Sequence, residues 1–349
     1  MRGIRGLLAC ALALASLTGC FSKTGPAEAT PGRSEAPAVA GPSGTGGPKA
    51  GEWRPAAGVK QVPIWPGPAP DAIADPRPES VGPPLGRPWW PRVNDVSRPT
   101  MTVYPPRGRS ARAAVIVFPG GGFQFLAMDI EGTEICDWLT SRGVTCVLSK
   151  YRVPDTNHHY DETCDCAVTP KVLRALQDAQ RTIRLVRARA GELDIDPAKI
   201  GVMGFSAGGY LVAQTSNIFA PAYAPVDAVD KVSSRPDFAI AAYPGHLCRA
   251  GGKLDPGLHV TRMTPPTLLV QAWDDPVDPV CNSTLYARAL DEAGVASEVH
   301  LFAKGGHAFG LRHPREPLGA WPSLVEAWLA AIGVTPPAGN DRDAAGAHP

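Results

Sequence analysis

Seven short apolar runs in the central part of the chain predict the strands of a buried β-sheet. The runs are rich in β-branched residues, and several are apolar at nearly every position, as expected for strands covered on both faces of a parallel sheet. They occupy residues 101–104, 113–118, 144–150, 200–205, 238–243, 267–273 and 298–302.

Segments with helical spacing lie between these runs and predict the layers that cover the sheet. They span residues 130–142, 171–190, 207–217, 281–293 and 321–332. The helix at 171–190 carries an apolar stripe that should face the sheet: Val172, Leu176, Ala179, Ile183 and Val186. Its arginines are expected on a solvated face: Arg174, Arg181, Arg184 and Arg187. The alternation predicts an α/β fold with an open, twisted, mostly parallel sheet, helices on both faces, and a site at the carboxyl ends of the strands.

The start of the chain predicts a secretion signal with a lipid attachment site. Arg2 and Arg5 precede an apolar run that is shorter than the about 20 apolar residues of a membrane span. The run ends in Leu-Thr-Gly-Cys20, which resembles the bacterial lipoprotein box. That resemblance implies removal of residues 1–19 and a lipid on Cys20; an ordinary signal peptide cut nearby is the alternative.

The composition on both sides of the strand–helix region predicts unstructured segments. Residues 20–58 and 336–349 are rich in small residues and proline and nearly empty of large apolar side chains. Such segments cannot bury enough surface to offset their ordering entropy, so we expect a lipid-anchored linker and a tail around one domain at 59–335. No Asp stands directly after Cys20. By the same resemblance, this favours attachment to the outer membrane, on its periplasmic or outer side. The net charge of +1 gives no indication of a nucleic-acid partner.

The pentapeptide Gly204-Phe205-Ser206-Ala207-Gly208 predicts a nucleophile. It follows an apolar run and precedes a helical segment, which is the context in which Gly-x-Ser-x-Gly forms a sharp strand-to-helix turn. Glycine at both flanking positions avoids collisions with neighbouring backbone. The Ser206 hydroxyl should therefore be held out at the carboxyl end of its strand.

Consecutive glycines at the end of an early strand predict an oxyanion hole. Pro119 is followed by Gly120, Gly121 and Gly122. Backbone N–H groups in such a loop can converge on a developing negative charge, and we expect those of Gly121 and Gly122 to act with that of Ala207. The loop resembles the His-Gly-Gly-Gly loop of esterases and lipases, with Pro119 in place of His. A phosphate-binding loop is the alternative, but no Gly-Lys-Ser/Thr follows.

An acid and a histidine follow the last two predicted strands. Asp274, Asp275 and Asp278 compete for the acid that would orient a histidine and stabilise its charged form. His307 lies among small residues in Lys-Gly-Gly-His-Ala-Phe-Gly, so its ring can reach a serine. Serine, acid and histidine then occur in the chain order of α/β-hydrolases. The alternative is that these Asp residues only stabilise turns.

Six cysteines remain after Cys10 and Cys20, and an even number in an oxidising compartment permits disulfides. Cys248 and Cys281 each follow a strand on the expected active-site side, so this is the predicted bridge. Cys136 and Cys146, in a predicted helix and strand, are expected to be small core residues. No metal or cofactor is predicted. One cluster of possible ligands is expected to form a loop with a disulfide or free thiols, because its cysteine spacing is not typical of zinc sites: His158, His159, Asp161, Cys164, Asp165 and Cys166.

The chain as a whole resembles bacterial α/β-hydrolases of the acetyl-xylan-esterase-like and dienelactone-hydrolase-like group. The resemblance covers about residues 59–335 and lies in seven segments: 64–70, 119–123, 150–154, 176–180, 201–209, the turn at 274–275, and 305–310. In this family the acid precedes a Pro/x-Val-x-Pro turn, which implies Asp275, with Asp274 second and Asp278 third. The chain departs from the family at 157–168 and at 243–248, near the expected pocket mouth, and these departures bear on the substrate.

The resemblance implies a serine carboxylesterase with Ser206, Asp275 and His307 as its triad. Its substrates would be short-chain, chiefly acetyl, esters, plausibly on carbohydrate, with no cofactor. Two alternatives belong to other classes. A serine peptidase of the prolyl-oligopeptidase type shares the triad but usually carries an N-terminal propeller, which the linker is too short to build. A non-catalytic polysaccharide-binding lipoprotein would have no need for the complete set of residues.

Overall fold

The computed structural model describes residues 51–82, 91–155, 159–161, 166–168, 172–312 and 317–337. The chain divides into two units, 1–45 and 46–349, and all described residues belong to the second. The signal, Cys20, most of the linker and the tail beyond residue 337 lie outside the described residues, as does Cys164. Within the described part of the chain, no helix is long and apolar enough to cross a membrane.

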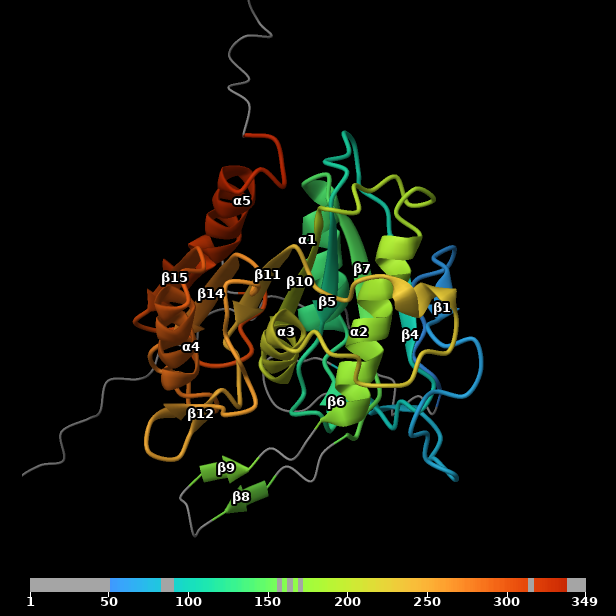
Figure 1. The fold of residues 1–349 in the computed structure, drawn as a ribbon, viewed down its shortest axis with the longest axis horizontal. Coiled ribbons are helices and arrows are strands. Elements are labelled where there is room, and N and C mark those ends of the chain that lie inside the picture. Colours follow the sequence, from blue (N-terminus) through green and yellow to red (C-terminus); the bar gives the residue numbers. More distant parts are fainter. Residues whose placement is uncertain are drawn as a thin grey trace, which may run out of the picture. The chain divides into compact units, whose positions relative to one another are not determined.

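An eight-stranded sheet forms the centre of the domain (Figure 1). Its strands, in spatial order, are β1 (Gln61–Pro63), β4 (Thr100–Tyr104), β7 (Thr145–Lys150), β5 (Ala114–Phe118), β10 (Ile200–Phe205), β11 (Phe238–Ala242), β14 (Thr267–Ala272) and β15 (Ser297–Phe302). The six strands from β7 to β15 are parallel, and β4 runs antiparallel to both of its neighbours. All seven predicted strands are therefore present within one residue at each end, and the predicted mostly parallel sheet is confirmed.

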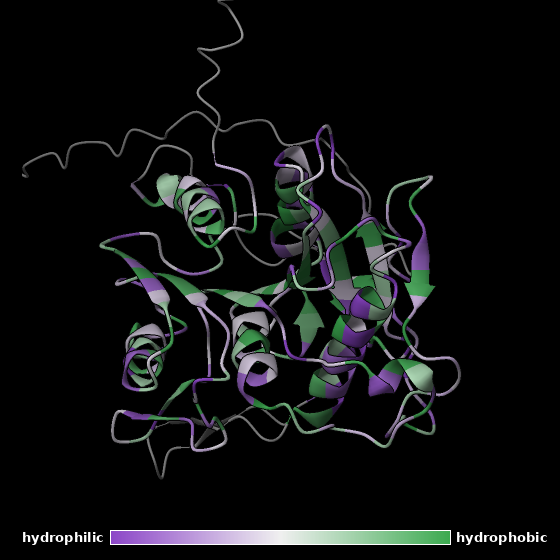
Figure 2. Cartoon of the chain, turned by 45° about the horizontal axis from the view of Figure 1, so that its top comes forward, coloured by the Kyte–Doolittle hydropathy of each residue, from purple (hydrophilic) through white to green (hydrophobic). Residues whose placement is uncertain are grey.

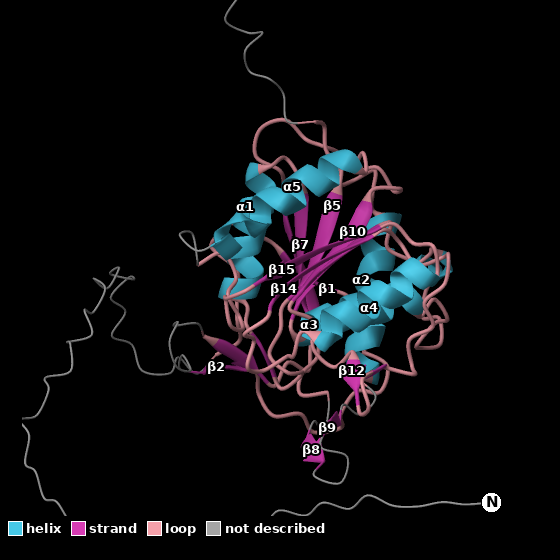
Figure 3. Ribbon diagram, turned by 90° about the vertical axis from the view of Figure 1, so that its left-hand side faces the viewer, coloured by secondary structure: helices cyan, strands magenta, loops and turns pink. Residues whose placement is uncertain are grey.

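Helices cover both faces of this sheet, as predicted. They are α1 (Glu134–Ser141), α2 (Leu173–Ala188), α3 (Ala207–Asn217), α4 (Cys281–Glu292) and α5 (Trp321–Ala331). In Figure 3, α1 and α5 lie on one face, and α2, α3 and α4 lie on the other. A π-helical turn, η1 (Asp129–Thr133), precedes α1 and covers part of the helix predicted to begin at residue 130.

Several short elements have no counterpart in the sequence prediction, because strands of two or three residues carry no readable periodicity. They are the edge strand β1, a three-stranded sheet of β2 (Ser80–Gly82), β3 (Arg92–Asn94) and β6 (Phe125–Leu126), the pair β8 (His159–Asp161) and β9 (Cys166–Val168), the hairpin β12 (Cys248–Arg249) and β13 (Lys253–Leu254), and the 3-10 turns η2 (Ala228–Lys231) and η3 (Pro317–Ala320).

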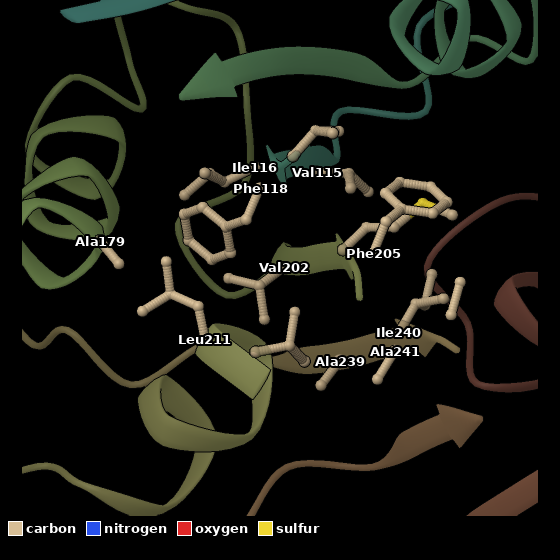
Figure 4. Packing of buried hydrophobic residues seen from close by; sticks show 14 of the residues in the cluster. Val115, Ile116, Phe118, Ala179, Val202, Phe205, Leu211, Ala239, Ile240 and Ala241 are labelled. Atoms are coloured by element: carbon tan, nitrogen blue, oxygen red, sulfur yellow. The ribbon is translucent and has the colours of Figure 1, made fainter. Parts of the chain in front are cut away.

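The core lies where the central strands meet the helices. Every residue of β5, β10 and β11 is buried, as expected for strands with both faces covered. Figure 4 shows side chains of these strands packed with Leu211 of α3 and Ala179 of α2. In Figure 2 the central strands are mostly hydrophobic, whereas the helices carry both polar and apolar residues. This packing makes the strand ends a rigid platform for the loops at the carboxyl edge.

The apolar stripe of α2 is buried as predicted, but the prediction that all its arginines are solvated is wrong. Arg181 and Arg184 are buried. Arg181 forms ion pairs with Asp227 and Asp230 of the η2 region, and Arg184 donates a hydrogen bond to the Tyr223 hydroxyl. The helix is therefore covered on a second side by the segment around 222–232, which sequence periodicity could not show.

The segment before the sheet packs over α2 through a tryptophan. Trp65 is buried, and its indole N–H donates a hydrogen bond to Asp178, which also pairs with Arg152. Further towards the N-terminus, Trp53 packs against the core, and its backbone N–H bonds the Glu79 carboxylate. These contacts fix the segment before the sheet against the domain.

Two disulfides lie in the described part of the chain. Cys248 and Cys281 are joined, as predicted, and connect the β12 hairpin to the start of α4. Cys136 and Cys146 are also joined, with 5.1 Å between their Cα atoms, so the prediction that they are unpaired core residues is wrong. A residue of α1 faces a residue of β7 directly, and this close approach of helix and strand is a tertiary contact that the sequence does not state.

Candidate active site

The predicted nucleophile lies on a strained turn between β10 and α3. Ser206 has φ 52° and ψ −119°, a backbone conformation that is costly for a residue with a side chain and is frequent at functional sites. A Cβ on Gly204 would lie 2.1 Å from the Gly208 carbonyl oxygen, and one on Gly208 would lie 2.0 Å from the Phe118 carbonyl oxygen. Both flanking glycines are therefore required by close backbone contacts.

The structure brings Ser206, His307 and Asp275 into one hydrogen-bonded chain. His307 Nε2 lies 3.0 Å from Ser206 Oγ, and His307 Nδ1 lies 2.8 Å from an Asp275 carboxylate oxygen. The Asp275 side chain is fully buried and His307 is 15% exposed. Three loops at the carboxyl ends of β10, β14 and β15 supply these residues, so parallel strands that are distant in the sequence place them together.

Hydrogen bonds within the loop after β14 separate the three competing acids. Asp275 uses one carboxylate oxygen to accept the N–H groups of Val277 and Asp278, which leaves the other for His307. Asp274 is exposed and accepts the N–H of Gly306 instead. Asp275 is therefore the acid that contacts Nδ1, whereas Asp274 holds the backbone of the histidine loop.

The glycine loop after β5 packs directly against the serine turn. A Cβ on Gly120 would lie 2.6 Å from the Phe205 carbonyl oxygen and 3.0 Å from Ser206 Cβ. Gly121 has φ 129° and Gly122 φ 60°, both in the region that favours glycine. No acceptor among the described residues takes a hydrogen bond from either N–H group. Ala207 is the first residue of α3, so its N–H has no intrahelical acceptor. Ala207 follows Ser206 directly, and Gly120 brings the glycine loop against the serine turn.

A buried glutamate behind this loop is a feature that the sequence analysis missed. Glu131 of η1 is 2% exposed and accepts hydrogen bonds from the Gly120 N–H, at 2.7 Å, and the Tyr243 hydroxyl, at 2.8 Å. Burial raises the pKa of Glu131, against the lowering effect of His307 and these two donors. The Tyr243 ring packs edge-on against His307 with 5.1 Å between ring centroids. Glu131 therefore connects the glycine loop, through the Tyr243 hydroxyl, to the aromatic ring that packs against His307.

The carboxylates around His307 raise its pKa. Burial alone would lower the pKa of this imidazole, but the Asp275 hydrogen bond and the negative charges of Asp278, Asp275 and Glu131 outweigh that effect. A base whose pKa is raised takes a proton from a hydroxyl more readily. The electrostatics of the site therefore favour the charged form of His307.

Asp278 lies almost as close to the Ser206 hydroxyl as His307 does. Its Oδ2 lies 3.1 Å from Ser206 Oγ and 3.7 Å from His307 Nε2, and its side chain is only 10% exposed. Burial, with a contribution from Asp275, raises its pKa to about 6, although His307 and the Ser206 hydroxyl lower it. The sequence analysis ranked Asp278 third as the triad acid, and the structure instead places it on the other side of the imidazole from Asp275.

Aromatic and charged residues form one wall beside the serine turn. The His246 ring lies 6.0 Å from Phe123 and 5.7 Å from Tyr210, measured between centroids. The Tyr210 hydroxyl donates to Asp255, which also pairs with Arg249. His246 belongs to 243–248, one of the two segments where the chain departs from the family that it resembles, and the Cys248–Cys281 disulfide ties the end of that segment to α4.

A large cavity in the described part of the chain lies elsewhere. It has a volume of about 870 Å³ and is lined by residues of 52–100 together with Arg152, Pro154 and Arg174. None of the serine, histidine or acid residues described above lines it. Arg152 and Arg174 are already engaged by Asp178 and Asp155. The convergence of reactive groups, and not the size of the cavity, therefore identifies the candidate active site.

The described residues contain no group of three or more His, Cys, Asp and Glu that could hold a metal ion. The candidate cluster around the β8 and β9 strands lies entirely outside the residues whose side chains the structure describes.

Two family models match the chain: the prolyl oligopeptidase family over residues 174–332, and the family described as BD-FAE over residues 101–219. An acetylxylan esterase from Xylanibacter ruminicola is 30% identical over 243 residues, which cover 62% of this chain and 45% of that protein. The chain spans less than half the length of the curated relatives that it matches.

Solved structures match over most of the domain. An acetyl ester-xyloside bifunctional hydrolase from Caldicellulosiruptor lactoaceticus is 31% identical with a TM-score of 0.61, covering 79% of this chain and 97% of that one. A thermophilic esterase from the Planctomycetes species Thermogutta terrifontis is 26% identical with a TM-score of 0.58, covering 74% and 97%.

The strand order and the loops after β10, β14 and β15 define the α/β-hydrolase class of proteins. With the matches above, they show that the chain belongs to the α/β-hydrolase superfamily.

Proposed function

We propose that the protein hydrolyses short-chain esters, chiefly acetyl esters of carbohydrate, through an acyl-enzyme on Ser206. The observation that carries this proposal is the chain of hydrogen bonds from Ser206 Oγ through His307 to Asp275, with the glycine loop packed against the serine turn. These are the groups that acyl transfer requires: a nucleophile, a base, an acid that orients the base, and donors for the oxyanion.

In the proposed reaction, His307 Nε2 takes the Ser206 proton while Oγ attacks the ester carbonyl carbon. The Gly121, Gly122 and Ala207 N–H groups stabilise the oxyanion. The protonated His307 then gives its proton to the leaving alcohol, and the C–O bond breaks to leave the acyl-enzyme. His307 next activates water, which releases the acid and restores the serine. Asp275 holds His307 with Nδ1 protonated and stabilises the imidazolium.

The relatives support a carbohydrate ester as substrate. The names of two of them include acetylxylan esterase and acetyl ester-xyloside hydrolase. Structures of the Thermogutta terrifontis esterase are described as propionate-bound and butyrate-bound, which supports a small acyl group. Polar and aromatic side chains near Ser206, among them Tyr210 and His246, suit a polyhydroxylated alcohol.

The test is hydrolysis of p-nitrophenyl acetate, butyrate and octanoate by the wild type and Ser206→Ala. We expect activity that falls with acyl length, and a loss of up to about 10⁶ in kcat on removal of the nucleophile. Release of acetate from acetylated xylan follows as the second substrate. Activity that survives Ser206→Ala would show that another group is the nucleophile, and octanoate preferred over acetate would rule out a small acyl pocket.

A second candidate is a serine peptidase, because the prolyl oligopeptidase family model matches residues 174–332. The same mechanism would act on an amide after proline. Cleavage of a proline p-nitroanilide peptide with no cleavage of acetyl esters would favour this candidate.

We also propose that Cys20 carries a lipid that anchors the protein in the cell envelope, at the outer membrane. The support is the Leu-Thr-Gly-Cys sequence after the short apolar run, and the linker composition that follows it.

A further inference from the structure

The Asp278 carboxylate lies in the active site without the partners that a structural carboxylate has. Buried carboxylates are usually held by several donors, because an unpaired buried polar group is costly. Asp278 Oδ2 lies 3.1 Å from the Ser206 hydroxyl and 3.7 Å from His307 Nε2, and no donor among the described residues reaches Oδ1. Asp275 already occupies His307 Nδ1, so Asp278 is not needed as the triad acid.

The absence of a side chain at residue 245 makes room for this carboxylate. A Cβ on Gly245 would lie 2.7 Å from Asp278 Oδ1 and 2.8 Å from Oδ2. The Gly245 N–H donates to the Ser206 carbonyl oxygen, so this backbone is fixed against the serine turn. The carboxylate is therefore held beside the nucleophile by packing, while Oδ1 remains available to a donor.

The strand order decides which part of a substrate Asp278 would meet. The glycine loop follows β5 on one side of β10, whereas Gly245 and Asp278 follow β11 and β14 on the other side. An ester whose carbonyl oxygen points to the glycine loop turns its other substituents towards Asp278. The leaving oxygen must approach His307 Nε2, which lies 3.7 Å from Asp278 Oδ2. A hydroxyl on the carbon next to that oxygen would come within hydrogen-bonding reach of the carboxylate.

We propose that Asp278 is a specificity-determining residue that accepts a hydrogen bond from a hydroxyl group adjacent to the ester on the leaving alcohol. This inference rests on the proposed esterase function and narrows its substrates to esters of vicinal diols, such as partly acylated sugars. A substrate ammonium group would also suit a carboxylate. It would lie beside His307 when that ring becomes positively charged, and like charges at this distance repel. A neutral hydroxyl avoids that conflict.

The test compares the monoacetate of cis-cyclohexane-1,2-diol with its methyl ether, which lacks the free hydroxyl. The kcat/KM ratio of the two esters is measured for the wild type, Asp278→Val and Asp278→Asn, with melting temperatures to confirm folding. We expect the wild-type ratio to exceed the Asp278→Val ratio by about tenfold or more, as for a hydrogen bond to a charged group. Intrinsic reactivity of the two esters cancels in this comparison. Equal ratios in all three proteins, with Ser206-dependent cleavage of both esters, would overturn the inference.

A second measurement needs no variant. The kcat/KM ratio of the two esters is measured for the wild type across pH. Protonation of His307 affects both esters alike and cancels in this ratio. Only a group that contacts the free hydroxyl can change it. Ser206, His307 and Asp275 are the polar groups that act on Asp278, and its pKa is about 6. The hydroxyl preference should therefore weaken below about pH 6, as a charge-assisted bond becomes a neutral one. A ratio that does not change with pH would overturn the inference. If the wild type cleaves neither these esters nor p-nitrophenyl acetate, the proposed function itself fails, and the inference falls with it; if it cleaves only p-nitrophenyl acetate, the inference alone is overturned.

Discussion

Asp278→Asn is expected to make the protein more stable at neutral pH. The ionised Asp278 is buried beside Ser206, and its pKa in the folded protein is about 6, against 3.8 for an ordinary Asp. A rise of roughly two pKa units corresponds to about 3 kcal/mol of destabilisation of the native state by the ionised form. Asn has nearly the same shape and carries no charge, so it removes this cost.

The direction of the pKa shift determines the pH range in which Asp278 destabilises the folded protein. Because the folded pKa is raised, the native state holds this proton more tightly than the unfolded chain does. The cost of Asp278 is thus absent below pH 3.8 and fully present above about pH 6. The difference in unfolding free energy between Asp278→Asn and the wild type should therefore grow by roughly 1–3 kcal/mol from about pH 4 to about pH 7.5.

The assay is urea unfolding with intact disulfides, followed by tryptophan fluorescence at both pH values. Asp274→Asn is the matched control, because it removes the same charge from an exposed position in the same loop. We expect no pH-dependent gain from this control. A difference between Asp278→Asn and the wild type that is the same at both pH values would refute the reasoning, since the cost would then not come from ionisation.

Three further predictions concern other parts of the protein. Asp275→Asn should lower kcat on p-nitrophenyl acetate by about 10⁴, because Asn favours the wrong tautomer of His307, whereas Asp274→Asn should cost far less; the reverse order would move the acid by one residue. Glu131→Gln should lower kcat by about tenfold or more, because one acceptor oxygen is replaced by an NH₂ group and the glycine loop shifts; an unchanged kcat would show that Glu131 does not position the oxyanion donors. Cys20→Ala should leave the membrane fraction when cells are fractionated and immunoblotted, and a variant that stays there would place the anchor elsewhere.

Local patterns were enough to predict the main elements of the fold. Continuous apolar runs identify strands buried on both faces, and the stripe on residues 171–190 identifies a helix against the sheet, because both patterns follow from the geometry of a single element. The elements of two or three residues were missed, since they exist only through pairing with distant segments. The burial of Arg181 and Arg184 was missed for the same reason: it depends on the segment at 222–232.

The two disulfides show which cysteine pairings can be predicted from position in the sequence. Cys248 and Cys281 follow strands whose carboxyl ends lie at the same edge, so topology alone brings them near each other. Cys136 and Cys146 lie in a helix and a strand that pack face to face, and their pairing depends on the rotation of the helix. Periodicity does not determine that rotation to the accuracy a disulfide needs.

At the site, the sequence by itself determined the type of chemistry. Gly-x-Ser-x-Gly, a glycine loop and a late histidine have local signatures, because each demands a particular turn after a strand. Only the tertiary structure decided the roles of three acids that lie within five residues of each other. Hydrogen bonds of one short loop direct Asp275 to His307 and Asp274 to Gly306, and a missing side chain at Gly245 admits Asp278 beside Ser206. The direction of a side chain in a loop depends on what surrounds it, and those surroundings come from strands far apart in the chain.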